Sequence, residues 1–290
     1  MAGVRSQHQM GAQHGSLSGF ESVSTEITVA SGQKLDGAQN TLHAELMVEP
    51  TSPQPRPSRR DRRRQETIDD IKTTARRQLA DGGPVQISLR AIARHLGMTA
   101  PAVHYYFPSR QALLDALIVD GFNSLADALR SSYHQAAAVP PDERCLAVYR
   151  AHRAWALDHP SEYLLLYGHT GSAARRGHPQ AHQAMLDVVA VLFTTMRDCV
   201  AAGDVDTERI EAATPAPLRE QLAAWRDAID GIGDLPDGAL AACMFGYSQL
   251  HGTITLELAG HLPPQLTDRS ALFDLQMTHV AAALRPQPPR

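Results

Sequence analysis

The stretch from Ser88 to Leu117, SLRAIARHLGMTAPAVHYYFPSRQALLDAL, constrains the fold of this chain more than any other stretch. The hydroxyl of Ser88 is placed to cap a short helix, and Ile92 and Leu96 recur on one face of that helix. Gly97 follows them, and glycine adopts a positive φ at little cost. The pattern therefore predicts a short helix that ends in a tight turn.

A second short helix is predicted directly after this turn. Thr99 is placed to cap it, and Pro101 falls in its first turn, where backbone N–H groups lack partners within the helix. Val103 and Phe107 are expected to face inward, and Pro108 disfavours helical geometry at the residue before it. Two short helices joined by a tight turn form a helix-turn-helix, which in many proteins places its second helix in the major groove of DNA.

Basic residues surround this predicted motif. The stretch from Arg56 to Arg110 holds 12 Lys and Arg against 5 Asp and Glu, a charge of +7. Because the whole chain has a net charge of −4, the remaining residues have a net charge of −11. Affinity for nucleic acid comes largely from basic side chains near the phosphates, so local charge matters more than the overall charge. The arginines from Arg59 to Arg64 are interpreted either as an arm that follows the DNA backbone or reaches the minor groove, or as a flexible, solubilising run.

The composition favours an α-helical, cytoplasmic protein. Of the 290 residues, 43% are apolar and only 5% aromatic, with Ala and Leu prominent, which favours helices over sheets. The chain has three cysteines, Cys145, Cys199 and Cys243. Because their number is odd and no two have CxxC spacing, the sequence indicates neither a disulfide framework nor a zinc site. No apolar run approaches the roughly 20 residues needed to cross a bilayer.

The helix-turn-helix region resembles the DNA-binding segment of the TetR family of bacterial transcriptional repressors, over roughly Gln65 to Leu117. The resemblance is carried by the spacing of Ala93 and Gly97, the capping Thr99, the aromatic run that ends in Phe107, and the Pro-Ser-Arg sequence before a Leu-rich helix. The family usually has Tyr at the position of His104 and Lys at that of Arg110. Both positions face DNA phosphates in the family pattern, and Arg110 keeps the charge.

The recognition helix is expected from Thr99 to Tyr106. Apolar atoms of Ala100, Pro101 and Ala102 are suited to thymine methyl groups, and the ring and hydroxyl of Tyr105 to bases or phosphates. Arg90 and Arg110 are expected on phosphates, whereas Tyr106 either contacts DNA or packs under the turn. The candidate DNA-binding residues are Arg64, Ser88, Arg90, Thr99, Ala100, Pro101, Ala102, His104, Tyr105, Tyr106 and Arg110.

The chain is divided into three parts. Residues 1–58 are rich in Gly, Ser, Gln, Thr and Pro and are predicted to be a disordered tail and linker, in which Met47 is an alternative start. Residues 59–108 form the predicted three-helix DNA-binding domain. Residues 109–285 form a predicted helical bundle for effector binding and dimerisation, which opens with a helix over 109–132 that joins the two functions in the family. The fold class is therefore all-α.

Further helices are expected near 141–158, 161–168, 180–202, 215–230, 237–260 and 266–284, between His-Pro, Gly and Pro-Pro breaks. Small-molecule cavities are largely apolar with a few polar anchors, so aromatic residues and methionines of this part are candidates for a cavity lining. Ordinary core packing is the alternative for each. The candidate ligand-binding residues are Trp155, Tyr163, Tyr167, Met185, Phe193, Trp225, Tyr247 and His251.

Residues 247–260 carry a second resemblance, to a TetR subgroup marked by an aromatic residue, a His-Gly pair and a following Leu-Glu. Here these are Tyr247, His251, Gly252, Leu256 and Glu257, with Tyr in place of the usual Trp of this Trp-His-Gly subgroup. A glycine inside a helix costs about 1 kcal/mol relative to alanine, and a close helix crossing, within the chain or across a dimer, would account for it. His251 either faces the ligand or satisfies a buried hydrogen bond.

Metal and catalytic sites have little support in the sequence. His178 and His182 have the i, i+4 spacing of two ligands on one helical face, but no third ligand follows at a recognisable spacing. No Ser/His/Asp or Cys/His grouping and no phosphate-binding glycine loop is legible. We therefore expect neither an enzyme nor a metal or other cofactor.

The expected function is a homodimeric repressor that binds a double-stranded DNA operator and is released by a small apolar or amphipathic effector. The last two helices would form a four-helix interface with their symmetry mates. An alternative is a redox- or ligand-responsive sensor without effector-driven release, in which a cysteine bridges two chains. An activator is a further alternative.

Overall fold

The computed structural model describes residues 58–168, 170–171, 177–227 and 235–287, and contacts group Pro57–Arg290 into one compact unit. Within these ranges every regular element is a helix, which confirms the all-α class. The α-helices are α1 (Arg59–Gly82), α2 (Leu89–His95), α3 (Ala100–Tyr106), α4 (Arg110–Gln135), α5 (Pro141–Asp158), α6 (Pro160–Tyr167), α8 (Pro179–Ala201), α9 (Thr207–Ala213), α10 (Ala216–Asp227), α11 (Asp237–Leu258) and α12 (Arg269–Leu284).

Most predicted helices occur with shifts of a few residues at their ends. One helix was missed: α9 has only seven residues, and its signal is the side chain of Asp206, which accepts a hydrogen bond from the backbone N–H of Arg209. A single cap is a weak signal without an apolar stripe of several turns beside it. In the described ranges no helix is both long and apolar enough to span a membrane. The predicted tail, residues 1–58 with Met47, lies outside the described residues except for Ser58.

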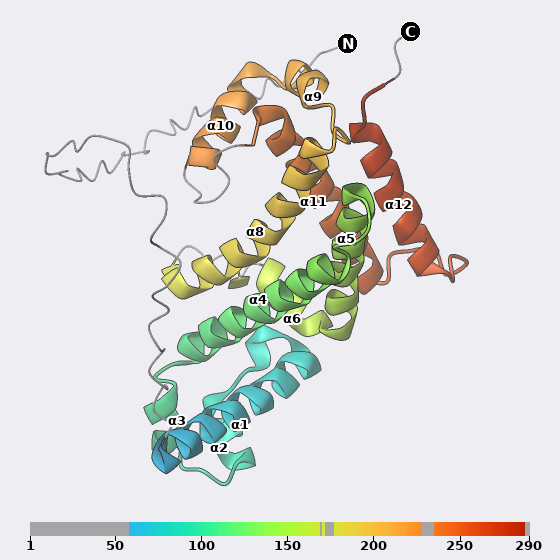
Figure 1. Cartoon of the computed structure of the whole chain (residues 1–290). Coiled ribbons are helices and arrows are strands. Elements are labelled where there is room, and N and C mark those ends of the chain that lie inside the picture. Colours follow the sequence, from blue (N-terminus) through green and yellow to red (C-terminus); the bar gives the residue numbers. More distant parts are fainter. Residues whose placement is uncertain (1–57, 169, 172–176, 228–234, 288–290) are drawn as a thin grey trace, which may run out of the picture. The chain divides into compact units, whose positions relative to one another are not determined.

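The first three helices form a small head at one end of the described unit (Figure 1). Ile71 of α1, Ile92 of α2 and Val103 of α3 are completely buried, and Leu113 at the start of α4 is buried with them. These apolar side chains come from all three helices of the head. Their removal from water holds the helices against each other. The head therefore presents the remaining faces of α2 and α3 to solvent.

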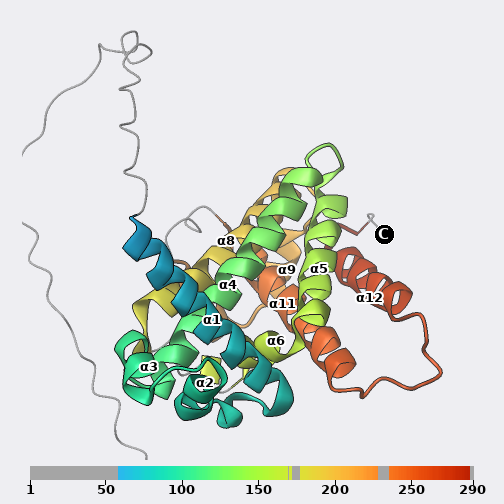
Figure 2. The ribbon, with the colours of Figure 1, turned by 90° about the horizontal axis from the view of Figure 1, so that it is seen from below.

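Helix α4 leads from the head into the body and lies beside α8 and α5, as both ribbon views show (Figures 1 and 2). Its buried face repeats at helical spacing through Leu117, Phe122, Leu125 and Leu129, as the sequence predicts. Helices α11 and α12 pack against each other and against α5. One continuous helix thus connects the head with the helices of the body.

Ion pairs fasten α1 of the head to the body. Lys72 Nζ lies 2.9 Å and Arg76 Nη2 2.8 Å from the two carboxylate oxygens of Asp120 on α4. Arg76 Nε also lies 3.8 Å from a carboxylate oxygen of Glu162 on α6. Because these charges are partly buried, they restrain the orientation of the head more than exposed pairs would.

Candidate nucleic-acid interface and ligand cavity

Local hydrogen bonds build the helix-turn-helix as the sequence predicts. The hydroxyl of Ser88 accepts from the backbone N–H of Ala91 (3.3 Å), and that of Thr99 accepts from Ala102 N–H (3.3 Å). Gly97 has a φ of +64°. Its N–H donates to the carbonyl of Arg94, and the next N–H donates to the carbonyl of Ala93, which closes the end of α2 in a Schellman motif.

Helix α3 exposes the residues expected of a recognition helix. Tyr105 is 70% exposed, which is unusual for a large aromatic side chain and leaves both its ring and its hydroxyl accessible. Tyr106 meets it edge-on, with ring centroids 5.2 Å apart, but is half-buried and packs against the core of the head. Pro101 is exposed, and Ala100 and Ala102 are half-buried. The helix therefore offers one aromatic side chain among small apolar ones.

The guanidinium group of Arg110 was expected to contact a DNA phosphate, but in the structure it is hydrogen-bonded within the chain. Its Nε donates to the carbonyl of Ile87 (3.2 Å), and its Nη2 donates to the carbonyl of Pro84. These hydrogen bonds form because the start of α4 lies close to the loop before α2. The sequence does not indicate this proximity. His104 is exposed, and its Nδ1 lies 3.2 Å from the carbonyl oxygen of Pro108.

The arginines within residues 59–64 form the first turns of α1. Ser58 and Asp61 form a capping box, in which the Ser58 hydroxyl accepts from Asp61 N–H and the Asp61 carboxylate accepts from Ser58 N–H. Hydrogen bonds from Ser58 hold the pKa of the Asp61 carboxyl below its usual range. Arg64 on α1 and Arg90 on α2 are both exposed. The run is thus presented as the ordered first turns of a helix.

A cavity of about 710 Å³ opens among α5, α8, α10 and α11. Four of the predicted ligand-binding residues line it: Met185 and Phe193 of α8, Trp225 of α10 and Tyr247 of α11. The rings of Phe193 and Trp225 lie 5.4 Å apart. The described lining contains no Asp, Glu, Lys or Arg, so the cavity suits a neutral, apolar molecule with few polar groups.

The other four candidates, Trp155, Tyr163, Tyr167 and His251, line neither this cavity nor the smaller one described below. Trp155 is buried, donates its indole N–H to Ser124 Oγ (3.1 Å) and stacks on His159. The hydroxyl oxygen of Tyr163 lies 2.7 Å from His251 Nδ1, within hydrogen-bond distance, and burial raises the pKa of Tyr163 to about 12. The aromatic pattern of the sequence thus predicts that these side chains are buried. It does not predict whether a buried side chain faces a cavity.

His152, a residue that the sequence reasoning missed, lies beside the rings of Tyr163, Tyr167 and His251. It is completely buried, and neither ring nitrogen has a hydrogen-bond partner among the described residues. Its ring lies 5.1 Å from that of His251 and 6.0 Å from that of Tyr167. Burial, and then the nearby His251, hold the pKa of His152 well below its usual value, so it is neutral at physiological pH.

Helices α11 and α12 both expose large apolar side chains. Phe245 and Leu256 of α11 are 43% and 46% exposed, and Leu275 of α12 is 55% exposed. Gly252 lies on the same side of α11, and a Cβ atom there would meet no atom of another described element within 4 Å. A close crossing within the chain therefore does not account for this glycine. Clustered exposed apolar side chains are typical of interaction surfaces.

Cys145, Cys199 and Cys243 line two neighbouring cavities between α5, α8, α11 and α12, where Cys199 is buried and the other two are partly buried. His178 caps α8, with its Nδ1 accepting from the N–H of Ala181 (3.4 Å). Among the described residues, no group of three potential ligands could hold a metal ion.

Comparisons with known proteins agree with this architecture. The family model described as "Bacterial regulatory proteins, tetR family" matches residues 71–117, and "Tetracyclin repressor-like, C-terminal domain" matches residues 145–280. The HTH-type transcriptional regulators Rv1816 of Mycobacterium tuberculosis and Mb1846 of Mycobacterium bovis are each 32% identical over 227 residues. This alignment covers 78% of this chain and 95% of each relative.

Solved structures show the same fold. The crystal structure of the regulatory protein SCO4313 is 30% identical, with a TM-score of 0.61 over 77% of this chain and 98% of that chain. A protein of unknown function from Rhodococcus sp. RHA1 is 22% identical, with a TM-score of 0.57 over 76% of this chain and 95% of that one. The likeness therefore extends from the head through the body.

Proposed function

Since the chain belongs to the TetR family of bacterial transcriptional regulators, which are not enzymes, we propose that it is a homodimeric repressor released from its operator by a small apolar or amphipathic effector. The observation that carries the proposal is the pairing of an exposed recognition helix with an interior cavity, joined by α4. This function places the protein in the cytoplasm, where bacterial DNA lies. The Trp-His-Gly subgroup remains a prediction.

Helix α3 reads the operator in this proposal. Tyr105 contacts bases or phosphates in the major groove, and Ala100, Pro101 and Ala102 pack against thymine methyl groups. Arg64 and Arg90 reach phosphates, which adds affinity on any sequence. Arg110 acts in part indirectly, because its bonds to two carbonyl groups fix the loop before α2.

Two chains pair through α11 and α12. The exposed Phe245, Leu256 and Leu275 support this assignment, and Gly252 leaves room for the partner's helix. The dimer carries two recognition helices, which must be spaced about 34–36 Å apart to enter successive major grooves. Static light scattering should show a dimer for the native protein. Phe245→Arg would bury an unpaired charge in the interface and should give a monomer, whereas a dimer that tolerates this change would contradict the proposed surface.

Effector binding in the cavity is coupled to DNA through α4. Helix α8 lines the cavity and packs along α4, and α4 carries the head through Asp120. An effector that favours a different position of α4 weakens DNA binding by the same factor by which DNA weakens effector binding. Small shifts suffice, because both heads must fit the DNA at once.

Intrinsic fluorescence tests the cavity, because the chain has two tryptophans and only Trp225 lines it. In a Trp155→Phe protein, titration with decanol should shift the emission of Trp225. The matched Trp225→Phe protein retains the buried Trp155 and should show no such shift. If decanol leaves the emission of Trp225 unchanged up to its solubility limit, the cavity does not take apolar ligands.

An operator selected from random duplexes then allows the regulatory role to be tested. A reporter gene placed behind this operator should be expressed less when the protein is present, and more again when an effector is added. Higher expression in the presence of the protein would instead show an activator.

A further inference from the structure

The three cysteines of the chain converge on two neighbouring cavities. Cys145 of α5 lines the large cavity and also a second cavity of about 240 Å³ between α5, α8 and α12. Cys199 of α8 lines the smaller cavity, and Cys243 of α11 lines the larger one. Cys145 therefore lies in the wall that separates the two cavities and is accessible from both.

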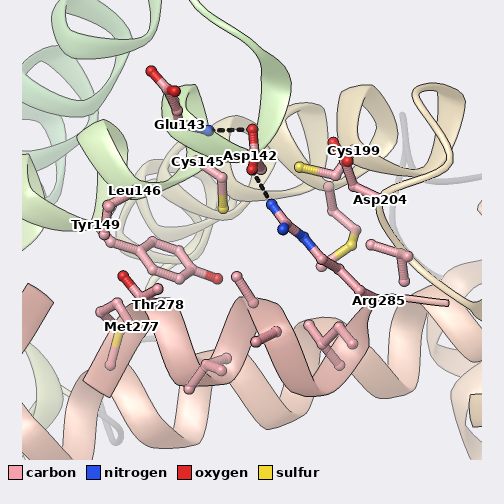
Figure 3. A pocket seen from close by; sticks show the side chains of 16 residues that line it. Asp142, Glu143, Cys145, Leu146, Tyr149, Cys199, Asp204, Met277, Thr278 and Arg285 are labelled. Atoms are coloured by element: carbon pink, nitrogen blue, oxygen red, sulfur yellow. Dashed lines mark hydrogen bonds and ion pairs between the residues drawn. The ribbon is translucent and has the colours of Figure 1, made fainter. Parts of the chain in front are cut away.

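Figure 3 shows the smaller cavity, into which the side chains of Cys145 and Tyr149 point. The guanidinium group of Arg285 is paired with the carboxylate of Asp142 beside it. Tyr149 also lines the larger cavity. A Cβ atom at Gly246 would lie 2.8 Å from the Tyr149 hydroxyl oxygen, so the glycine makes the room that this hydroxyl occupies.

The surroundings distinguish Cys145 from the other two thiols. Cys145 lies near the N-terminus of α5, whereas Cys199 lies in the last turn of α8, where the helix dipole disfavours a thiolate. A hydrogen bond from the thiol of Cys199 lowers the pKa of Cys145; burial opposes this, and a hydrogen bond from the hydroxyl of Tyr149 adds to the lowering. Burial raises the pKa of Tyr149 well above its usual value, so this hydroxyl keeps its proton and donates.

The other two thiols are held in the protonated form. The hydrogen bond with Cys145, and then burial, raise the pKa of Cys199, and burial raises the pKa of Cys243. The thiolate is the nucleophilic form of cysteine, so the cysteine whose pKa is lowered, and which lines a cavity, is the most reactive of such a group.

We propose that Cys145 adds covalently to apolar α,β-unsaturated carbonyl compounds that bind in the large cavity. The cavity has room for such a molecule, and its described lining carries no Asp, Glu, Lys or Arg that would favour a charged ligand. The inference rests on the proposed function of this cavity as the effector site, and it names the chemical class of the effector.

The addition balances without an oxidant or a second reactant. Deprotonated Cys145 sulfur forms a bond to the β-carbon of the ligand, and the carbon–carbon π bond breaks. Its electron pair moves onto the α-carbon and the carbonyl oxygen as an enolate. The enolate takes up one proton at the α-carbon, which replaces the proton lost by the thiol, so the product is a thioether of the saturated ketone. Tyr149 lies beside the sulfur and stabilises the thiolate.

The experiment uses the full-length, reduced protein and pentyl vinyl ketone, with ethyl pentyl ketone as the saturated control. Intact mass should show one adduct with the unsaturated ketone and none with the control, and peptide mapping should place it on Cys145. Labelling of Cys145 should be on the order of tenfold faster than labelling of Cys243 at neutral pH. Tyr149→Phe should slow the reaction at Cys145 only, and Cys145→Ser should abolish the fast phase.

First labelling at Cys199 or Cys243, or an unchanged fast phase in Cys145→Ser, would overturn the proposal. Mapping of the native protein at low stoichiometry gives the same answer without any variant. Operator binding of the labelled protein separates the inference from the proposed function. An adduct on Cys145 with intact operator affinity would support the covalent chemistry and overturn the assignment of such ketones as the effector, while the reporter experiment tests effector-driven release by itself.

Discussion

Asp120 connects the DNA-binding head to the body, and its replacement tests whether this junction is stabilised as the structure indicates. Its carboxylate accepts from Lys72 Nζ at 2.9 Å and from Arg76 Nη2 at 2.8 Å, and its side chain is 29% exposed. Hydrogen bonds to charged groups contribute about 1.5–3 kcal/mol when buried, and partial exposure reduces this. We expect Asp120→Asn to lower the free energy of unfolding by about 1–2 kcal/mol.

Urea denaturation followed by circular dichroism measures this change, and a double-mutant cycle with Lys72→Met isolates the pair. The matched control is Asp127→Asn, the same substitution on the same helix, at a carboxylate that is 75% exposed and paired with Arg130. The control should change stability little, because exposed ion pairs contribute little. If both variants unfold at the same urea concentration, the junction is not held by these charges, and the coupling route through Asp120 is wrong.

Three further predictions concern single residues. Tyr105→Ala should weaken operator binding by about 1–3 kcal/mol and leave non-specific binding unchanged, as fluorescence anisotropy at fixed salt would show; equal losses on all sequences would contradict base contact. Arg110→Ala should lower stability by about 1–2 kcal/mol, because two carbonyl groups lose their donor; a variant that alters only the salt dependence of DNA binding would show a pure phosphate contact. His152 stays neutral in the folded protein, whereas the unfolded chain takes up a proton at this residue as the pH falls. The free energy of unfolding should therefore fall by up to about 1.4 kcal/mol for each pH unit below about 6.5. Urea titrations of His152→Leu should show a smaller dependence of the free energy of unfolding on pH.

The sequence determined the elements whose causes are local. Ser88 and Thr99 cap α2 and α3, and Gly97 provides the turn between them, because each acts on backbone groups within a few residues. The apolar repeat of α4 likewise predicted its buried face, since helical geometry alone places those side chains together. The whole helix-turn-helix and the all-α class could therefore be predicted.

Only the tertiary structure decided which side chains meet across helices. From the sequence, Tyr163 and Tyr247 are equally good candidates for lining a cavity. In the structure, Tyr163 is hydrogen-bonded to His251 in the core, whereas Tyr247 lines the cavity. The hydrogen bonds of Arg110 to loop carbonyls and the placement of Cys199 and Cys243 in the two cavities that Cys145 lines are of the same kind. Such contacts depend on the packing angles of helices far apart in the chain, and no spacing along the sequence encodes those angles.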